Sequence, residues 1–165
     1  MKSFYELFVN ELKDIYGTEN QYLTALLKMS LAANSRALKE AFVQHVEETR
    51  NHIKRLDQVF KELQENPAGS HSDAMEGLFK EATDVAKADY DVLVKDAALI
   101  NCAQRNEHYQ IALYGILKTF AKHLQLDNAA KLFAQTLQEE KNADAALTKI
   151  AEDYGINETA LRRSA

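Results

Sequence analysis

The sequence predicts an all-α protein, built as a four-helix bundle of two helical hairpins with an additional short crossover helix. Three observations support this fold class. Ala, Leu, Lys, Glu and Gln, which favour helices, dominate the 165 residues, whereas five Gly and a single Pro leave few breaks. Apolar residues recur three and four positions apart over long stretches, which is the spacing of one helix face. A single main polar connection divides this pattern into two halves.

Composition predicts one globular domain over residues 1–165, because 46% hydrophobic residues supply a substantial core. The formal net charge of −5 argues against a nucleic-acid partner, which requires clustered Lys and Arg. No stretch approaches the roughly 18 apolar residues of a membrane span, and the amino terminus lacks the apolar core of a signal peptide. We therefore expect a cytoplasmic protein without a membrane or nucleic-acid partner. The lone Cys102 excludes an intrachain disulfide.

The first predicted hairpin carries polar residues inside its apolar stripes. Ser3-Phe-Tyr-Glu6 has the form of a capping box, so the first helix begins there. Its stripe comprises Phe4, Phe8, Leu12, Ile15, Glu19, Tyr22, Leu26 and Met29. Asn34-Ser35 supplies the N-cap of the second helix. That stripe includes Leu38, Ala41, Phe42, Ile53, Leu56, Val59, Phe60 and Leu63, with His45, Glu48 and His52 in its middle.

A crossover segment separates this hairpin from the second one. Residues 64–72, which contain Pro67 and Gly69, form the main connection. Asp73-Ala-Met-Glu76 can form a capping box for a short third helix, although Glu76 is also a candidate metal ligand.

The second predicted hairpin again places carboxylates on apolar stripes. The fourth helix begins near residues 88–91 and carries Glu107 at mid-stripe, and the fifth is capped by Asp127-Asn128 and carries Glu140 and Asp144. Gly155 is the predicted C-cap, and residues 156–165 are expected to form a short docked turn followed by a frayed end. Two hairpins joined by one long crossover are the ferritin-like arrangement of a four-helix bundle.

An internal repeat connects the polar residues of the two hairpins. When residues 45–52 are laid over residues 137–144, Glu48 falls on Glu140 and His52 falls on Asp144. Each pair is spaced i, i+4, which places both side chains on one helix face. Each pair also has an upstream glutamate: Glu19 precedes Glu48 by 29 residues, and Glu107 precedes Glu140 by 33. This pattern is typical of a metal site built twice.

Buried carboxylates require compensation, because an unpaired charge in a protein interior costs several kcal/mol. Two iron or manganese ions would supply it, and oxygen donors with few imidazoles and no thiolate favour these metals over structural zinc. The predicted ligands of one ion are Glu19, Glu48 and His52, and those of the other are Glu107, Glu140 and Asp144. Glu48 and Glu140 are the predicted bridging carboxylates.

Other interpretations of these residues stay open. Glutamates are abundant in this chain, and chance places some of them on apolar stripes. His45, one turn before Glu48, is either a ligand, a hydrogen-bonding partner of a ligand, or a core histidine bonded to a backbone carbonyl. Glu47 and Glu139 lie about 100° round from their neighbours, so we expect them at the rim of the site or in salt bridges.

Several segments resemble the YciE/YciF-type ferritin-like stress proteins of bacteria. They are residues 38–49, 74–78, 96–100, 107–115 and 136–141, and they follow one order between Phe4 and Tyr154. The resemblance implies a ferritin-like bundle with an extra helix, a homodimer, and a di-metal centre related to that of rubrerythrins. The chain departs from the wider di-iron pattern Glu-x-x-His, because Asn51 and Ala143 stand three residues after Glu48 and Glu140. A single-metal or half-occupied site therefore remains an alternative.

The leading hypothesis for function is a stress-associated di-iron or di-manganese protein that reacts with peroxide or dioxygen, as a peroxidase, catalase or ferroxidase does. The alternative is a non-catalytic dimeric stress scaffold or partner-binding protein with a vestigial metal site. A third hypothesis, a storage cage, requires a closed shell of many subunits. Tyr22 and Tyr114 lie near the predicted ligands on their stripes. Core packing with a satisfied hydroxyl is the expected role, and the alternative is a redox or hydrogen-bonding neighbour of the ligands.

Overall fold

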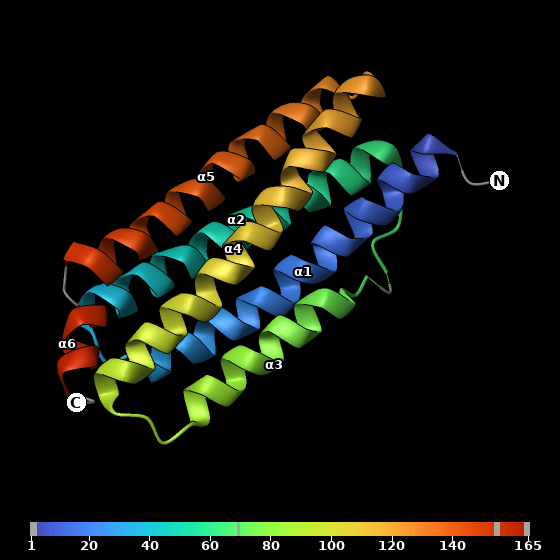
Figure 1. The fold of residues 1–165 in the computed structure, drawn as a ribbon. Helices are drawn as coiled ribbons and strands as arrows, with labels where there is room; N and C mark the ends of the chain where they lie inside the picture. The colour runs from blue at the N-terminus through green and yellow to red at the C-terminus, as the bar shows by residue number, and fades with distance from the viewer. Residues whose placement is uncertain (1–2, 69, 154–155, 164–165) are drawn as a thin grey trace.

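The computed structural model describes residues 3–68, 70–153 and 156–163, and the regular elements in these ranges are all α-helices. They are α1 (Phe4–Ala32), α2 (Arg36–Leu63), α3 (Asp73–Lys87), α4 (Val92–His123), α5 (Asp127–Asp153) and α6 (Ile156–Arg163) (Figure 1). The all-α prediction is therefore confirmed. Gly69 and Gly155, the predicted connection and C-cap glycines, lie outside the described residues.

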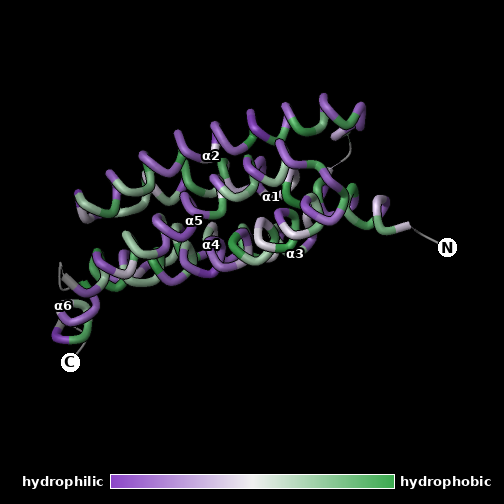
Figure 2. The backbone as a smooth tube through the Cα atoms, turned by 90° about the horizontal axis from the view of Figure 1, so that it is seen from above, coloured by the Kyte–Doolittle hydropathy of each residue, from purple (hydrophilic) through white to green (hydrophobic). Residues whose placement is uncertain are grey.

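The four long helices pack as a ring. α1 packs against α2 and α4, and α5 packs against the same two helices, so α1 and α5 occupy one diagonal of the bundle. α3 crosses between the hairpins and lies along α1 and α4, while α6 packs against α4 and α5 at one end of the bundle (Figure 1). This is the predicted arrangement of two hairpins and a crossover helix. Hydrophilic and hydrophobic stretches alternate along the long helices, as amphipathic packing requires (Figure 2).

Local capping explains where the helices begin. The Ser3 capping box is present, and Ser35 caps α2 as predicted. The predicted cap of α3 is wrong by one residue: the hydroxyl of Ser72 accepts from the amide of Met75, and Asp73 lies in the first turn. Asp73 there complements the positive end of the helix dipole instead of capping it.

Two other features of the fold were not predicted from the sequence. Residues 156–163 form the helix α6, which buries Ile156 and Ala160, and the predicted docked turn is therefore wrong. Asp96, near the start of α4, is fully buried and accepts hydrogen bonds of 2.7 Å from the backbone amides of Asn34 and Ser35. This carboxylate ties α4 to the turn between α1 and α2.

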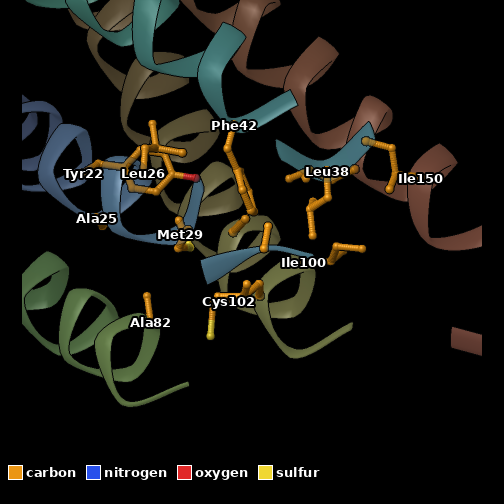
Figure 3. Packing of buried hydrophobic residues seen from close by; sticks show 14 of the residues in the cluster. Tyr22, Ala25, Leu26, Met29, Leu38, Phe42, Ala82, Ile100, Cys102 and Ile150 are labelled. Carbon is orange, nitrogen blue, oxygen red and sulfur yellow. The ribbon is translucent and has the colours of Figure 1, made fainter. Parts of the chain in front are cut away.

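The apolar core consists of two clusters, one toward each end of the bundle. One contains Leu26, Met29, Leu38, Phe42 and Ile100 (Figure 3), and the other contains Phe8, Leu12, Leu56, Phe60 and Phe133. Tyr22 belongs to the first cluster and Tyr114 to the second. Buried polar residues lie between the two clusters, in the middle of the bundle.

Candidate metal centre

Two groups of buried carboxylates and imidazoles lie in the middle of the bundle. One consists of Glu19 from α1, His52 from α2 and Glu140 from α5, and the other of His45 from α2, Glu107 from α4 and the same Glu140. Within each group, one potential ligand atom per residue lies within 4.8 Å of the others. All five side chains are buried, and Glu140 belongs to both groups.

The two oxygens of Glu140 face different histidines. Its Oε1 lies 3.1 Å from Nδ1 of His52, and its Oε2 lies 3.4 Å from Nε2 of His45. The remaining carboxylates complete the two groups: Glu19 Oε1 lies 3.2 Å from His52 Nδ1, and Glu107 Oε1 lies 3.3 Å from His45 Nε2. The inward-facing nitrogen of each histidine therefore lies near two carboxylates.

These close atoms are not hydrogen bonded to one another. Partners are absent for His45 Nε2, His52 Nδ1, both oxygens of Glu140, and Oε2 of Glu19 and of Glu107. Buried polar atoms without partners are rare in folded proteins, because each costs about 1–3 kcal/mol. Ligands at about 2.0–2.2 Å from one ion lie about 3.0–3.4 Å from each other, in the range observed here. The donor set therefore fits a pair of metal ions.

Outer carboxylates fix the orientation of both histidine rings. Nε2 of His52 lies 2.9 Å from Glu139, which also accepts two hydrogen bonds from the guanidinium of Arg55. Nδ1 of His45 lies 3.1 Å from Glu48. In a neutral imidazole, one ring nitrogen carries the proton and the other carries a free lone pair. When the outer nitrogen donates its proton to a carboxylate, the inner nitrogen is therefore able to bind a metal.

Two buried tyrosines hold the glutamates of α1 and α4. Tyr22 donates a 2.6 Å hydrogen bond to Oε1 of Glu107, and Tyr114 donates to Oε1 of Glu19. Burial raises the pKa of both hydroxyls well above the ordinary value, and the neighbouring carboxylates raise it further. Both tyrosines therefore stay protonated donors.

The metal-free centre retains protons. Burial raises the pKa of Glu140 to about 8, and repulsion from Glu107 contributes. Burial opposes the charged form of His52, but the negative charge of Glu19 and the neighbouring carboxylates of Glu139 and Glu140 outweigh it and raise the pKa to about 12. Burial likewise opposes the charge of His45, whose pKa is nevertheless raised well above its ordinary value by Glu107 and Glu140. In the absence of metal, imidazolium groups therefore compensate the carboxylates.

Among the residues predicted as ligands, Glu19, His52, Glu107 and Glu140 come together in this centre. Glu48 belongs to neither group: it is partly exposed and contacts the outer nitrogen of His45 and the amide of Gln44. Asp144 also belongs to neither group, because its oxygens lie near Gln104 and His108.

His45 joins Glu107 and Glu140, where the sequence pattern gave Asp144, and Glu140 joins Glu19 and His52, where the pattern gave Glu48. His45 and His52 are seven residues apart, which is two helical turns, so both rings point along the same face of α2. The i, i+7 spacing was the signal that could have identified His45. Glu139 forms a salt bridge with Arg55 as predicted, and its contact with His52 is a role that the pattern did not specify.

A small pocket leads to the centre between α2 and α5. Its volume is about 80 Å³, and its lining includes His45, Glu48 and Glu107 together with Ala143 and Ala146. A cavity of this size holds a few water molecules and no large substrate. The group containing His45 is therefore the one that small molecules reach.

A third group of possible ligands lies at the surface. His71, Asp73 and Glu76 gather at the start of α3, and all of them are exposed. Glu76 lies 3.3 Å from His71 and away from the buried centre. The group has the character of an ordinary surface ion pair near a helix N-terminus.

The chain matches the model of a protein family described as "Domain of unknown function (DUF892)" over residues 3–161. The chain belongs to this family. Protein YciF of Escherichia coli (strain K12) is 43% identical over 152 residues, which cover 92% of this chain and 92% of the relative. The predicted relationship to YciF-type proteins is thus confirmed.

Solved structures agree with the fold. The E. coli stress protein YciF matches with a TM-score of 0.90 at 41% identity, covering 96% of this chain and 99% of that chain. YcfI of Rhodopseudomonas palustris, described as a putative structural protein, matches with a TM-score of 0.87 at 41% identity, covering 91% and 96%. These matches confirm the ferritin-like bundle. Among the described helices, none has both the length and the apolar character needed to cross a membrane.

Proposed function

We propose that the buried centre binds two iron or manganese ions and reacts with a small oxidant, peroxide or dioxygen. One ion is held by Glu19, His52 and Glu140, and the other by His45, Glu107 and Glu140. The observation that carries the proposal is a set of buried nitrogens and oxygens 3.1–3.4 Å apart, among which His45 Nε2, His52 Nδ1 and both oxygens of Glu140 have no hydrogen-bond partner. Glu140, with one oxygen toward each histidine, would contribute a ligand to both ions.

The charge of the site supports two divalent ions. Three buried glutamates with two neutral histidines carry a charge of −3, which a metal pair of +4 compensates. Carboxylates outnumber imidazoles and neither group contains a thiolate, a set that favours iron or manganese. Such a pair supplies a Lewis-acidic centre that can change oxidation state.

The residues of the chain have distinct tasks in this proposal. Glu139 and Glu48 hold the rings of His52 and His45, and the tyrosine hydroxyls hold Glu107 and Glu19. The apolar clusters on both sides exclude bulk water. The 80 Å³ pocket limits entry to small molecules.

Metal analysis tests the assignment. Protein purified without chelator and then loaded anaerobically with Fe(II) or Mn(II) is expected to contain about two ions per chain by plasma mass spectrometry. Glu140→Ala should lose most of this metal, because it removes a ligand from both positions. Asp144→Ala and the exposed Glu62→Ala serve as matched controls and should retain it. Full occupancy in Glu140→Ala would overturn the assignment, and loss in Asp144→Ala would place that carboxylate among the ligands.

Reaction with the oxidant is tested separately on the loaded protein. Mixing with peroxide or dioxygen should change the absorption spectrum of the wild type and of Asp144→Ala, but not that of Glu140→Ala. If the loaded wild type does not respond, the proposed reaction is wrong even where metal binding is correct.

A non-catalytic scaffold is the second candidate. It is favoured by the description of YcfI as a putative structural protein and by the imidazolium groups that compensate the metal-free centre. In either case we extend to this chain a stress-associated role, on its similarity to the stress protein YciF, with a homodimer in the cytoplasm. A dimer by light scattering that takes up no metal after anaerobic loading would favour the scaffold.

A further inference from the structure

Gln110 on α4 has a buried side-chain amide that braces none of the ligands of the centre. Its side chain is fully buried, and neither Oε1 nor Nε2 has a hydrogen-bond partner. A side-chain amide can donate two hydrogen bonds and accept two. Leaving both ends without partners costs about 1–3 kcal/mol for each group, so an amide at this position needs a compensating role.

Helix geometry places Gln110 between the two groups of ligands. Glu107, Gln110 and Tyr114 are spaced i, i+3 and i+7 and are all buried, so they share the inner face of α4. Glu107 contacts His45 in one group, and Tyr114 contacts Glu19 in the other. Gln110 therefore lies along the helix axis between the two ion positions.

Thr49 on α2 occupies the corresponding place between the two histidines. It follows His45 by four residues and precedes His52 by three, and it is fully buried. Its hydroxyl also lacks a hydrogen-bond partner. Two helices on opposite corners of the bundle thus each carry one buried, unpartnered neutral group between residues of the two ligand groups.

The internal repeat explains why the amide of Gln110 is not needed to hold a glutamate ligand. Tyr22 follows Glu19 by three residues, as Gln110 follows Glu107. Tyr22 reaches across to hold Glu107, whereas Glu19 is held by Tyr114 instead of by Gln110. Gln110, the counterpart of Tyr22 in the second half of the repeat, therefore holds neither glutamate.

We propose that Gln110, with Thr49, binds a small oxygen-bearing ligand, such as water, hydroxide or peroxide, at the centre between the two ions. The inference rests on the proposed di-metal function. An uncharged amide can donate to an anionic oxygen and accept from a protonated one, and it adds no charge to a site that the metals already balance. The pocket that reaches Glu107, one turn away, admits ligands of this size.

The test uses shape-conserving variants with a matched control on the same helix. Gln110→Met and Thr49→Val remove the unpartnered polar groups, whereas Gln104→Met removes an amide that donates to Asp144 and Thr148. In metal-free protein, thermal unfolding should move to higher temperature for Gln110→Met and to lower temperature for Gln104→Met. A lower melting temperature in Gln110→Met would show a structural role and overturn the inference.

Azide is the probe of ligand binding to the metal-loaded protein. Metal content by plasma mass spectrometry should be the same in the wild type, Gln110→Met and Gln104→Met. The dissociation constant for azide should rise about tenfold in Gln110→Met, the effect of one lost hydrogen bond to a charged ligand, and stay unchanged in Gln104→Met. Unchanged azide affinity in Gln110→Met, or loss of metal from this variant, overturns the inference, whereas the proposal that the wild type binds two ions then still stands. A wild type that takes up no metal overturns the proposed function, and this inference with it.

Discussion

The hydroxyl of Tyr22 on α1 holds Glu107 on α4 at 2.6 Å, while Tyr114 on α4 holds Glu19 on α1. The two hydrogen bonds cross the interface between the same two helices in opposite directions. Each tyrosine comes from the helix that supplies the other's glutamate. Helix packing and placement of the carboxylates are therefore coupled, and a change in one pair affects both.

Removing either hydroxyl should destabilise the metal-free protein. Tyr22→Phe or Tyr114→Phe leaves a buried carboxylate without its donor, so we expect a loss of about 1–3 kcal/mol in the free energy of unfolding. Urea denaturation measures it. Tyr16→Phe is the control, because Tyr16 donates to Asp57 at the surface, and we expect a change within about 0.5 kcal/mol. Equal losses in Tyr22→Phe and Tyr16→Phe would contradict the bracing role.

Metal uptake should release protons and strengthen as the pH rises. The pKa of Glu140 is raised from 4.5 to about 8 and that of His52 from 6.5 to about 12, so the folded metal-free protein binds more protons than the unfolded chain between these values. Its stability should therefore fall as the pH rises from about 5 to 8. Metal binding removes these protons, so the increase in melting temperature on adding Mn(II) should be larger at pH 8 than at pH 6.

Calorimetry measures the released protons directly. The apparent enthalpy of Mn(II) binding to the metal-free protein should vary with the ionisation enthalpy of the buffer near neutral pH. A binding enthalpy that is the same in all buffers would indicate that the centre is already deprotonated.

The sequence predicted the fold well because helix periodicity and capping are local properties. Ser3 and Ser35 cap helices as expected, but Ser72 replaces Asp73 because both residues have capping side chains and only the geometry of the preceding loop selects between them. Residues 156–163 were predicted as a turn, since their helix depends on packing against α4 and α5.

The residues of the candidate site were predicted only in part, because local spacing does not determine which side chains meet in the interior. The repeat pointed to Glu48 through its i, i+4 spacing from His52, and to Asp144 through the same spacing from Glu140. This spacing does not specify which of the neighbouring residues faces the centre. In the structure, His45 directs Nε2 toward Glu107 and Glu140 in the centre. Glu48 lies on the outer side of the ring and contacts Nδ1. Long-range contacts, such as the one between His52 and Glu139, have no local sequence signal.

The pair of Glu139 and Arg55 should control one ion position and not the other. Glu139→Gln weakens the contact that orients His52 and breaks the ion pair with Arg55. We expect one of two bound ions to weaken by about 10–100-fold, which is typical for loss of an outer carboxylate. Competition with a chelator resolves the two affinities. Glu62→Gln on the surface of α2 should leave both unchanged, and equal weakening of both ions in Glu139→Gln would contradict the assignment.

A glycine contact should determine how the crossover segment packs on α1. A Cβ at Gly17 would lie 2.8 Å from the backbone nitrogen and Cα of His71, closer than side chains approach backbone, so Gly17→Ala must displace the segment before α3. At Gly77 the same Cβ meets nothing within 4 Å, and alanine there should stabilise the exposed helix by about 0.5–1 kcal/mol. Thermal unfolding should therefore shift in opposite directions for Gly17→Ala and Gly77→Ala. Because both substitutions gain the same intrinsic helix propensity, a stabilising effect at both positions would mean that the approach of the backbone of His71 to α1 is not required.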